Sequence, residues 1–527
     1  GGGEARQLTH TKNGASTPRW SPDGERIVFL MQEKDSEAEE KQKKAKDDPV
    51  IVGQNDFKQT HLWVIDVETM RAEPELLFTL PEGKSDQDAE KEQDQKDKSE
   101  RLTEGDCHVS DPRWSPDDKQ MAFVSAPSPK SDDTMFKATV QILDVETKGF
   151  RKLTPYDGGE SAPRWSPDGT HLAFLYSPEG YGQRDLHIIP VEGGTPTNLT
   201  LAFDRNTDTP VWSPDGATLY FGAMDGVRRH LYTISPLPSP PPPSPKALGV
   251  GAKGERARGS EIRRITQGDC VIGGISVADD GDTFLCSRAT LHTPADLWAG
   301  SLHTGELRQL TKLNPQIEDF ALGKTRVIRW KSNDGLEIEG LLCLPVGYED
   351  GKSYPLIVEP HGGPHGGARD LGFKAQWHYF SGEGFAVFAP NFRGSDGYGR
   401  DFARANFGDW GIGDYQDIMT GVDNLIKQGI AHPERLVVGG WSYGGYMTAW
   451  IITQTDRFKA AMKGCGITNH VSMYGQTDIP TFMQLYFADG APAQQLELYR
   501  KLSPMSYTHR VKTPTLILHG AEDKRVP

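Results

Sequence analysis

The sequence predicts an all-β propeller over residues 1–314, followed by a mostly parallel, doubly wound α/β domain over residues 320–527. Two observations carry this prediction: a short motif recurs along the first part of the chain, and the hydrophobic pattern changes after it. The length of 527 residues also exceeds what one compact core usually holds, so two or more domains are expected.

The dipeptide Leu-Thr, once replaced by Ile-Thr, marks each repeat of the first domain. It recurs at 8–9, 102–103, 153–154, 199–200, 265–266 and 310–311. In four of the five intervals Trp-Ser-Pro-Asp follows 11 or 12 residues after the Thr, and the fifth interval carries a degraded version at 275–281. Pro presets φ and Asp-Gly tolerates positive φ, so this motif closes a hairpin. Hairpins repeated at about 46 residues are typical of propeller blades, and five blades are expected.

Two of the intervals are longer than this period. Mixed-charge, low-complexity runs near 33–48 and 83–100 lengthen the first interval, and a proline-rich run at 236–259 lengthens the fourth. Such compositions cannot support a packed core. We therefore expect solvated surface loops, with partner binding as the alternative.

After about residue 314 the pattern changes from hairpins to alternating strands and helices. Residues 325–330 and 338–342 flank an Asn-Asp-Gly turn and predict an antiparallel pair. Short apolar runs, typical of buried parallel strands, then alternate with helical stretches such as 414–427 and 446–455.

The composition excludes several classes of protein. The chain has 58 basic and 73 acidic residues, a net charge of −15, and no basic stripe, so nucleic acid is not an expected partner. No apolar run approaches the roughly 20 residues of a membrane-spanning helix. The five cysteines are scattered and odd in number, which argues against a disulfide framework or a zinc cluster. A reduced, cytoplasmic protein without a metal or organic cofactor is expected, and the absence of an initiator Met leaves an N-terminal signal open.

Residues 440–444, Gly-Trp-Ser-Tyr-Gly, are the strongest candidate for chemistry. They lie between a predicted strand that ends at Gly439 and a predicted helix that starts near Gly445. The flanking glycines allow the backbone to turn sharply and lift the Ser442 hydroxyl above the sheet edge, as in a nucleophile elbow. A glycine-rich turn without chemistry is the alternative.

Two backbone N–H groups are candidates for an oxyanion hole. Residues 361–363, His-Gly-Gly, follow a predicted strand that ends at Glu359, a position from which such a loop donates a backbone N–H. We expect Gly363 to supply this donor and Tyr443, directly after Ser442, to supply the second. The His361 side chain is expected to anchor the loop.

Asp523 follows the last predicted strand and is the expected orienting carboxylate, preferred over Glu522. The histidine that acts as the general base should follow this acid, but only four residues do. His470, His509 and His519 lie before it. His519 ends a predicted buried strand, so a structural role in the core or loop is the better interpretation of this residue. The sequence therefore supplies a nucleophile, oxyanion donors and an acid, but no convincing base.

Taken together, these motifs resemble the prolyl oligopeptidase family of serine peptidases, in particular its acylaminoacyl-peptidase-like branch. The resemblance covers nearly the whole chain. After the Trp-Ser-Pro-Asp-Gly repeats, specific motifs lie at 361–365, 391–399, 440–446 and 519–527. It implies a propeller followed by an α/β-hydrolase domain that cleaves short peptides, with the propeller excluding folded proteins. In this branch the released product is typically an N-acylated amino acid.

The resemblance also assigns roles to residues. Ser442 would form the acyl-enzyme and Asp523 would be the acid of the triad, because it lies three residues before Val526 as in the family motif. Arg525 matches a position that holds a substrate carbonyl, with an ordinary surface arginine as the alternative. The loop at 391–399 is expected to be structural.

The residue that precedes the cleaved bond would occupy an apolar pocket. Phe482, Tyr486 and Phe487 are candidates for lining it, although aromatic residues there could equally be core. An esterase-like α/β hydrolase and a non-catalytic propeller scaffold are the alternative functions. The propeller and Arg525 favour peptides over simple esters, and the intact nucleophile and oxyanion donors argue against a scaffold. The sequence leaves a homo-oligomer open.

The chain departs from the family pattern at both ends. Family propellers usually have seven blades, and the catalytic histidine lies a few tens of residues beyond the acid. We therefore expect a fragment that is about two blades short at its start and that lacks the last strand and helix of the hydrolase domain.

This expectation predicts that the 527-residue chain is nearly inactive, because loss of a triad member lowers the rate on the order of 10⁴- to 10⁶-fold. Turnover of an acyl-amino-acid anilide by purified chain 1–527 measures this. Measurable turnover that disappears in Ser442→Ala would contradict the prediction. The coding sequence after Pro527 gives a second check, since a histidine is expected within about 50 codons.

Overall fold

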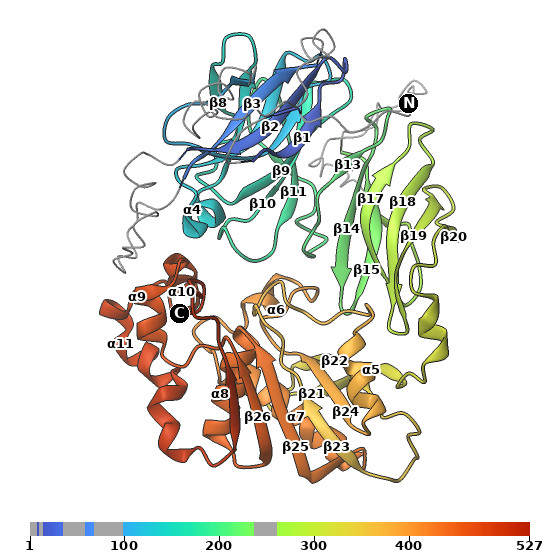
Figure 1. Cartoon of the computed structure of the whole chain (residues 1–527), viewed down its shortest axis with the longest axis vertical. Coiled ribbons are helices and arrows are strands. Elements are labelled where there is room, and N and C mark those ends of the chain that lie inside the picture. The colour runs from blue at the N-terminus through green and yellow to red at the C-terminus, as the bar shows by residue number, and fades with distance from the viewer. Residues whose placement is uncertain (1–7, 10–13, 35–57, 68–98, 237–260) are drawn as a thin grey trace, which may run out of the picture. The chain divides into compact units, whose positions relative to one another are not determined.

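The computed structural model describes residues 8–9, 14–34, 58–67, 99–236 and 261–527 (Figure 1). The predicted charged inserts near 33–48 and 83–100 and the proline-rich insert at 236–259 lie almost wholly outside these residues. Along the described chain, strands dominate the first part, and helices alternate with strands in the last part.

Five groups of four consecutive strands form the propeller part. The first two groups are β1 (Ser16–Trp20), β2 (Arg26–Gln32), β3 (Thr60–Asp66), β4 (Glu100–Arg101) and β5 (His108–Trp114), β6 (Gln120–Ala126), β7 (Thr139–Asp144), β8 (Phe150–Lys152), with the short helix α4 (Ser131–Phe136) between β6 and β7. The others are β9 (Glu160–Trp165), β10 (His171–Tyr176), β11 (Asp185–Pro190), β12 (Thr197–Asn198); β13 (Val211–Trp212), β14 (Leu219–Asp225), β15 (Arg228–Ile234), β16 (Arg263–Arg264); and β17 (Val271–Val277), β18 (Thr283–Thr290), β19 (Thr293–Ser301), β20 (Leu307–Gln309).

These groups correspond to the five intervals of the sequence repeat. Neighbouring strands within each group are antiparallel, and β15 and β17 join the fourth and fifth groups through a parallel pair. Apolar residues pack between adjacent groups, as where Val64 and Leu102 of the first meet Val109 and Phe123 of the second. The predicted propeller is thus confirmed.

The serine of each Trp-Ser-Pro-Asp turn ties the turn to the strand that follows it. In the first repeat Ser21 Oγ donates to Asp23 Oδ1 at 2.5 Å, and the Arg26 N–H donates to Ser21 Oγ at 2.9 Å. The later repeats make the same serine-to-aspartate bond in the pairs Ser115–Asp117, Ser166–Asp168 and Ser213–Asp215. The serine hydroxyl lowers the pKa of Asp23 and of its three equivalents. The motif therefore recurs because it closes each hairpin locally.

The threonine of the Leu-Thr dipeptide has an equally repetitive role. Its hydroxyl accepts a hydrogen bond from a leucine N–H in the third strand of the same group, in the pairs Thr103–Leu62, Thr200–Leu186, Thr266–Leu231 and Thr311–Leu297, at 2.9–3.0 Å. The hydroxyl replaces a backbone acceptor where the short fourth strand ends. A buried N–H left without such a partner would cost free energy, which explains the recurrence of threonine.

The second group solves the same problem with a carboxylate. The Val140 N–H donates to Glu160 Oε2 at 2.5 Å, and the Thr154 hydroxyl donates to the other carboxylate oxygen. Glu160 is almost fully buried, and burial raises its pKa to about 7. In the second group the N–H of the third strand therefore also has a side-chain acceptor, but this acceptor is a titratable carboxylate.

Tryptophans of the motif link neighbouring groups. Trp114 Nε1 donates to Arg19 O at 3.3 Å, and Trp165 Nε1 donates to Arg113 O at 3.0 Å. Each indole thus reaches the backbone carbonyl just before the tryptophan of the preceding group. The two bonds link the first strands of the first three groups, β1 to β5 and β5 to β9.

A seven-stranded sheet forms the α/β domain. Its strands are β21 (Thr325–Lys331), β22 (Glu337–Cys343), β23 (Tyr354–Val358), β24 (Ala386–Asn391), β25 (Ala431–Trp441), β26 (Phe458–Gly464) and β27 (Thr515–Leu518), in the order β21-β22-β24-β23-β25-β26-β27. The first two form the predicted antiparallel pair, and the last five are parallel. The predicted doubly wound hydrolase sheet is confirmed.

Helices alternate with these strands in the chain. They are α5 (Ala375–Gly382), α6 (Arg400–Arg404), α7 (Gly413–Lys427), α8 (Tyr443–Gln454), α9 (His470–Gln476), α10 (Pro480–Tyr486) and α11 (Pro492–Lys501), with 3₁₀ turns η1 (Pro315–Asp319) and η2 (Pro504–Arg510). The chain leaves β23 toward β24 on one side and later places β25 on the other side. In open α/β sheets, the carboxyl ends of strands at such a reversal form the ligand-binding crevice.

Contacts divide the chain into two compact units. One comprises Gly1–Gly180 and His187–Thr197, and the other comprises Tyr181–Leu186 and Asn198–Pro527. The second unit therefore holds the last two propeller groups together with the seven-stranded sheet. Within it, the Leu371 N–H donates to Val227 O at 2.8 Å, which fixes the β14–β15 turn beside the hydrolase sheet.

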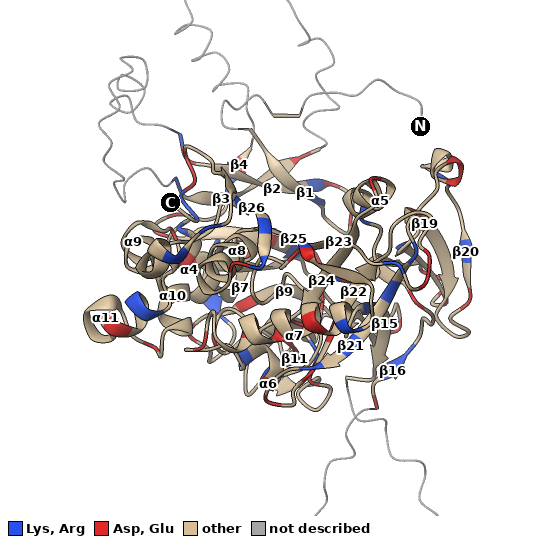
Figure 2. Ribbon diagram, turned by 90° about the horizontal axis from the view of Figure 1, so that it is seen from below, with Lys and Arg blue, Asp and Glu red and all other residues tan. Residues whose placement is uncertain are grey.

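Figure 2 shows acidic and basic residues interspersed along the described elements. A search of the described helices finds none that is both long and apolar enough to cross a membrane.

The threonine–leucine bond generates a stability prediction. Thr266 is fully buried, and Thr266→Val would leave the Leu231 N–H without an acceptor. We expect a loss of about 1–3 kcal/mol in the free energy of unfolding, measured by urea-induced unfolding. Thr266→Ser keeps the acceptor and is the matched control. Equal transitions for Thr266→Val and the wild type would show that the bond contributes nothing.

Candidate active site

Ser442 stands at the junction of β25 and α8, in a backbone conformation that side-chain-bearing residues rarely adopt. Its φ is 58° and its ψ is −119°. β25 ends at Trp441 and α8 begins at Tyr443, so only Ser442 separates them. The predicted ends, Gly439 and Gly445, lie farther apart, because Gly439 and Gly440 continue the strand. The Ser442 N–H donates to Gly464 O at 2.9 Å, and Ser442 O accepts from the Tyr446 N–H at 2.9 Å. The predicted sharp turn is therefore present, and its backbone is hydrogen-bonded on both sides.

The glycines around Ser442 leave no room for side chains. A Cβ on Gly444 would lie 2.2 Å from Pro360 O, and a Cβ on Gly445 would lie 2.3 Å from Gly464 O. A Cβ on Gly440 would lie 2.6 Å from backbone atoms of Gly444. Such distances are far inside van der Waals contact, so glycine is required at all three positions for α8 to approach the sheet.

The loop after β23 runs beside Ser442. A Cβ on Gly362 would lie 3.6 Å from Ser442 Cβ. Gly363 has a φ of 115°, which favours glycine, and Tyr443 is the first residue of α8, where N–H groups lack an acceptor inside the helix. The two predicted oxyanion donors thus belong to the two segments that adjoin Ser442. Their joint action as an oxyanion hole stays a prediction.

His361 anchors this loop, in agreement with the interpretation of the sequence. Its ring is buried and stacks on Phe392 with centroids 4.3 Å apart. Nδ1 lies 2.6 Å from Gly362 O, and Nε2 lies 2.7 Å from Ser395 Oγ. Burial lowers the pKa of His361 to about 4, so the ring is neutral near pH 7.

Asp523 lies in the turn after β27. Its Oδ1 accepts the N–H groups of Arg525 and Val526 at 3.0 and 2.9 Å. His519 Nε2 donates to Val526 O at 2.5 Å and lies 3.6 Å from Asp523 Oδ2. Since β25, β26 and β27 are adjacent and parallel, Ser442 and Asp523 both follow the carboxyl ends of strands at one edge of the sheet.

One group of metal-type donors occurs among the described residues, and it could not be predicted from the spacing of these residues in the sequence. Donor atoms of Cys465, His519 and Asp523 lie within 4.8 Å of one another. Cys465 follows β26 and its N–H donates to Leu518 O at 2.8 Å, which brings together residues far apart in sequence. A thiolate, an imidazole and a carboxylate are ligands that suit Zn²⁺, so this group could hold a metal.

Arg525 is held in place by a carboxylate. Its Nε and Nη2 donate to the two oxygens of Asp478 at 2.7 and 3.1 Å, and this bond raises the pKa of Arg525. The Asp478 N–H donates to Lys524 O at 3.0 Å, and the Thr477 hydroxyl donates to Arg525 O at 2.8 Å. The guanidinium is therefore oriented, with about half of the side chain exposed.

The three aromatic residues that the sequence offered for an apolar pocket are packed as core. Phe482, Tyr486 and Phe487 are at most 5% exposed. The Trp410 ring lies 6.0, 4.8 and 5.6 Å from their centroids, and the Tyr181 ring lies 4.9 Å from that of Phe482. These contacts pack α10 against the Trp410 and Tyr181 rings.

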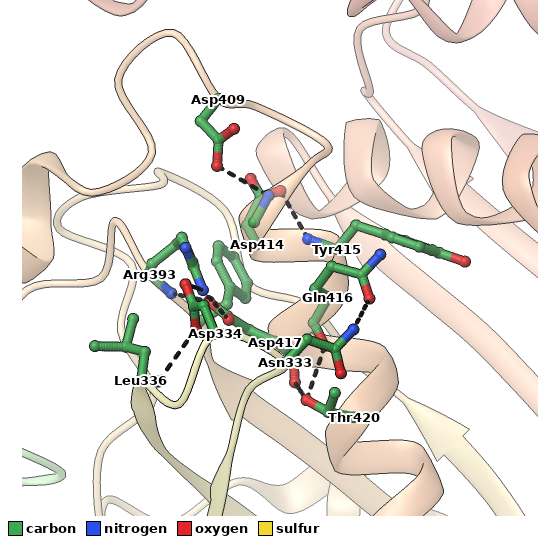
Figure 3. Close-up of polar contacts among 12 residues, drawn as sticks. Asn333, Asp334, Leu336, Arg393, Asp409, Asp414, Tyr415, Gln416, Asp417 and Thr420 are labelled. Carbon is green, nitrogen blue, oxygen red and sulfur yellow. Dashed lines mark hydrogen bonds and ion pairs between the residues drawn. The ribbon is translucent and has the colours of Figure 1, made fainter.

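Buried acids on α7 form a network that sequence reasoning missed (Figure 3). Arg393 donates to both carboxylate oxygens of Asp417 at 2.8–2.9 Å, and its Nη2 lies 2.9 Å from Asp334 Oδ2. This fixes the loop at 391–399 against the turn between β21 and β22. The sequence feature that could have indicated this network is the pair Asp414 and Asp417, which lie three residues apart and so on one face of a predicted helix.

Asp414 connects this network to the residue after the nucleophile candidate. It is fully buried, and the Tyr443 hydroxyl donates to its Oδ2. Burial raises the pKa of Asp414 to about 7; the Tyr443 hydrogen bond opposes this rise, whereas the charges of Asp417 and Asp409 add to it. The bond ties the first residue of α8 to α7, so the position of the predicted Tyr443 N–H donor depends on a titratable group.

A propeller followed by an α/β sheet with serine at the elbow is the architecture of a serine peptidase. Comparison with known proteins agrees. The family model described as "Prolyl oligopeptidase family" matches residues 371–527, and the model described as "TolB beta propeller domain" matches residues 85–236.

Two relatives and one solved structure illustrate the similarity. The uncharacterized peptidase YuxL of Bacillus subtilis is 31% identical over 539 residues, which cover 100% of this chain and 77% of that protein. The acylamino-acid-releasing enzyme of Arabidopsis thaliana is 39% identical over 187 residues, which cover 34% of this chain and 24% of that enzyme. The acylaminoacyl peptidase structure from Pyrococcus horikoshii aligns with a TM-score of 0.63 at 23% identity, covering 97% of this chain and 80% of that one, and shows the same fold. The chain belongs to the prolyl oligopeptidase family.

Asp414 generates a prediction about pH. Its pKa rises from an ordinary 3.8 to about 7 on folding, so the folded chain keeps a proton that the unfolded chain releases between these values. Stability therefore falls as pH rises through this window, by up to about 1.4 kcal/mol per pH unit for this group, and Glu160 adds a similar decline. Asp414→Asn should flatten the dependence.

Thermal unfolding between pH 4 and pH 8, at about half-unit steps, measures the effect. Asp423→Asn is the matched control, because it removes the same charge from an exposed position on the same helix and should keep the wild-type slope. An unchanged slope in Asp414→Asn would contradict the assignment.

Proposed function

We propose that the protein is a serine peptidase that hydrolyses short peptides through an acyl-enzyme on Ser442, releasing N-acylated amino acids or short N-terminal units. The observation that carries the proposal is the backbone of Ser442, whose φ of 58° and ψ of −119° at the strand–helix junction are those of a nucleophile elbow. The membership of the prolyl oligopeptidase family and the names of the acylaminoacyl relatives support it.

In the acylation step, Ser442 Oγ attacks the carbonyl carbon of the substrate and loses its proton to a general base. The carbonyl oxygen, on which negative charge develops, accepts hydrogen bonds from the N–H groups of Gly363 and Tyr443. Collapse of this intermediate breaks the peptide bond, and the protonated base gives its proton to the leaving amine. Water then hydrolyses the acyl-enzyme by the same route.

Asp523 would orient the imidazole of the base. Its Oδ1 is occupied by two backbone N–H groups, and its Oδ2 faces the nearest ring, that of His519, at 3.6 Å. His519 itself donates to a backbone carbonyl, and no histidine ring among the described residues hydrogen-bonds Ser442 Oγ. We therefore assign no described histidine as the base.

Arg525 would bind a carbonyl of the substrate. Asp478 holds two nitrogens of its guanidinium, which keeps the group oriented while about half of the side chain is exposed. An oriented guanidinium loses little entropy when it binds, which suits recognition of an acyl carbonyl.

The domain limits and the compartment are part of the same proposal. We place the propeller at residues 1–314 and the catalytic domain at residues 320–527, because η1 separates the last propeller strand from the first strand of the seven-stranded sheet. All five cysteines are free thiols, which supports a reducing compartment such as the cytoplasm.

Kinetics of the protein expressed from its complete coding sequence test the proposal. We expect hydrolysis of an acyl-amino-acid anilide, and Ser442→Ala should lower kcat on the order of 10⁴- to 10⁶-fold because the acyl-enzyme cannot form. Ser472→Ala, at an exposed position on α9, is the matched control and should keep the wild-type rate.

The same assay distinguishes the esterase alternative. A peptidase should keep a high kcat/KM for an acyl-peptide, whereas an esterase should cleave only the matching ester. Absence of anilide and peptide hydrolysis in a folded protein that cleaves the ester would overturn the proposal, and absence of all turnover would favour a binding scaffold.

A further inference from the structure

The pairing of β26 and β27 brings a cysteine and a histidine together at the end of the seven-stranded sheet. Gly464 and Leu518 are register partners, so the residues that follow them, Cys465 and His519, leave the two strands side by side. The Cys465 N–H donates to Leu518 O at 2.8 Å, which extends the pairing by one bond. The turn after β27 then places Asp523 Oδ2 3.6 Å from His519 Nε2.

The donor atoms of these three residues are close enough to bind one metal ion together. One donor atom from each of Cys465, His519 and Asp523 lies within 4.8 Å of the other two. In a tetrahedral zinc site, metal–ligand bonds of about 2.0–2.3 Å place neighbouring donors roughly 3.5 Å apart. The widest separation therefore has to shrink by at most about 1.3 Å, a distance that side-chain rotation can supply.

Each residue keeps an electron pair for a metal. Asp523 Oδ1 accepts the N–H groups of Arg525 and Val526, which orients the carboxylate. In the described part of the chain, neither Asp523 Oδ2 nor Cys465 Sγ hydrogen-bonds another residue. His519 Nε2 donates its proton to Val526 O, so the neutral ring still has one lone pair. Ligating carboxylates and imidazoles in metal sites are commonly held by such outer hydrogen bonds.

Charge and exposure at the site also suit a divalent cation. A thiolate and a carboxylate carry two negative charges, which balance the two positive charges of Zn²⁺. The Arg525 guanidinium already binds both oxygens of Asp478, so its charge opposes a cation less. Cys465 is 8% exposed, and the side chains of His519 and Asp523 are 28% and 18% exposed. An ion can therefore enter from solvent, with water as its fourth ligand.

We propose that Cys465, His519 and Asp523 bind Zn²⁺ and that the bound ion inhibits hydrolysis. On binding, the Cys465 thiol loses its proton to solvent, and the thiolate sulfur, one imidazole nitrogen and one carboxylate oxygen each donate an electron pair to the metal. The inhibition rests on the proposed function, in which Asp523 orients the imidazole of the base. An oxygen that coordinates Zn²⁺ is withdrawn from the N–H of that imidazole, so the base loses its orientation.

Metal binding to the protein expressed from its complete coding sequence tests the site directly. Co²⁺ is the first probe, because a bond between Co²⁺ and a thiolate gives a charge-transfer absorption band that histidine and aspartate ligands do not produce. Zn²⁺ titrated into the Co²⁺ form should remove this band. Cys465→Ser should abolish the band and weaken Zn²⁺ binding at least about 10- to 100-fold, since it removes a ligand.

A second variant keeps the test decisive if Cys465→Ser fails to fold. His519→Gln should also weaken Zn²⁺ binding, measured by competition with a chelating dye. His509→Gln, at an exposed position on η2, is the matched control and should bind Zn²⁺ as the wild type does.

Turnover of an acyl-amino-acid anilide measures the inhibition. Zn²⁺ should lower the kcat of the wild type over the concentration range in which it binds, and a chelator should restore the rate. Cys465→Ser should require at least about 10-fold more Zn²⁺ for the same fractional loss of its own metal-free rate. Mg²⁺ prefers oxygen ligands and should not inhibit either protein.

The outcomes distinguish this inference from the proposed function. Absence of turnover in the metal-free protein would overturn the peptidase and with it the inhibition, whereas the Co²⁺ spectrum would still decide the metal site. Absence of the thiolate band, or equal Zn²⁺ affinity in the wild type and Cys465→Ser, would overturn the metal site. Binding of Zn²⁺ at these residues without loss of turnover would overturn the inhibition.

Discussion

The hydrolase part depends on one close approach of backbone to backbone. The first turn of α8 touches the loop after β23 and the end of β26 without an intervening side chain, because Gly444 and Gly445 occupy the contact points. A Cβ on Gly464 would lie 2.1 Å from the Trp441 ring, so the residue before Ser442 also relies on this gap. If the helix stood farther away, the first N–H groups of α8 and the loop at 361–363 would no longer meet around Ser442.

The propeller also depends on particular residue types at particular backbone positions, but there the residues are polar rather than glycine. There, short polar side chains take the place of missing backbone partners: a serine holds each turn, and a threonine hydroxyl holds the N–H of a leucine in the third strand. Glu160 does the work of that threonine once, and its burial makes it titrate near pH 7. In both parts of the chain, the backbone geometry at these positions thus determines which residue type can occupy them.

Local requirements of this kind explain how much could be predicted from the sequence. The blades, the elbow at Ser442 and the turn that carries Asp523 each depend on residues within about ten positions of one another, so their motifs are legible in a single sequence. The predicted end of β25 at Gly439 was wrong by two residues, because paired glycines usually stop a strand. In this chain the glycines stay extended, since the helix packs against them.

Other features could not be predicted, because they join residues that are distant in sequence. Asp414 meets Tyr443 from another helix, and Cys465 meets His519 only through the pairing of β26 and β27. Asp111 of β5 likewise binds Arg164 of the next group, 53 residues later in the chain. Neither composition nor spacing indicates such long-range contacts, because they arise only when helices and strands pack against one another.

The tryptophan bonds between propeller groups also have a consequence for folding during synthesis. The serine–aspartate turn of a group forms within five residues, whereas its indole needs a carbonyl that lies in the group before it. During synthesis, the second and third groups can therefore close their own turns and then bond to a group that has already emerged. For these groups assembly can proceed in the direction of translation, whereas the Val227 carbonyl of the fourth group waits for the Leu371 N–H of the hydrolase part.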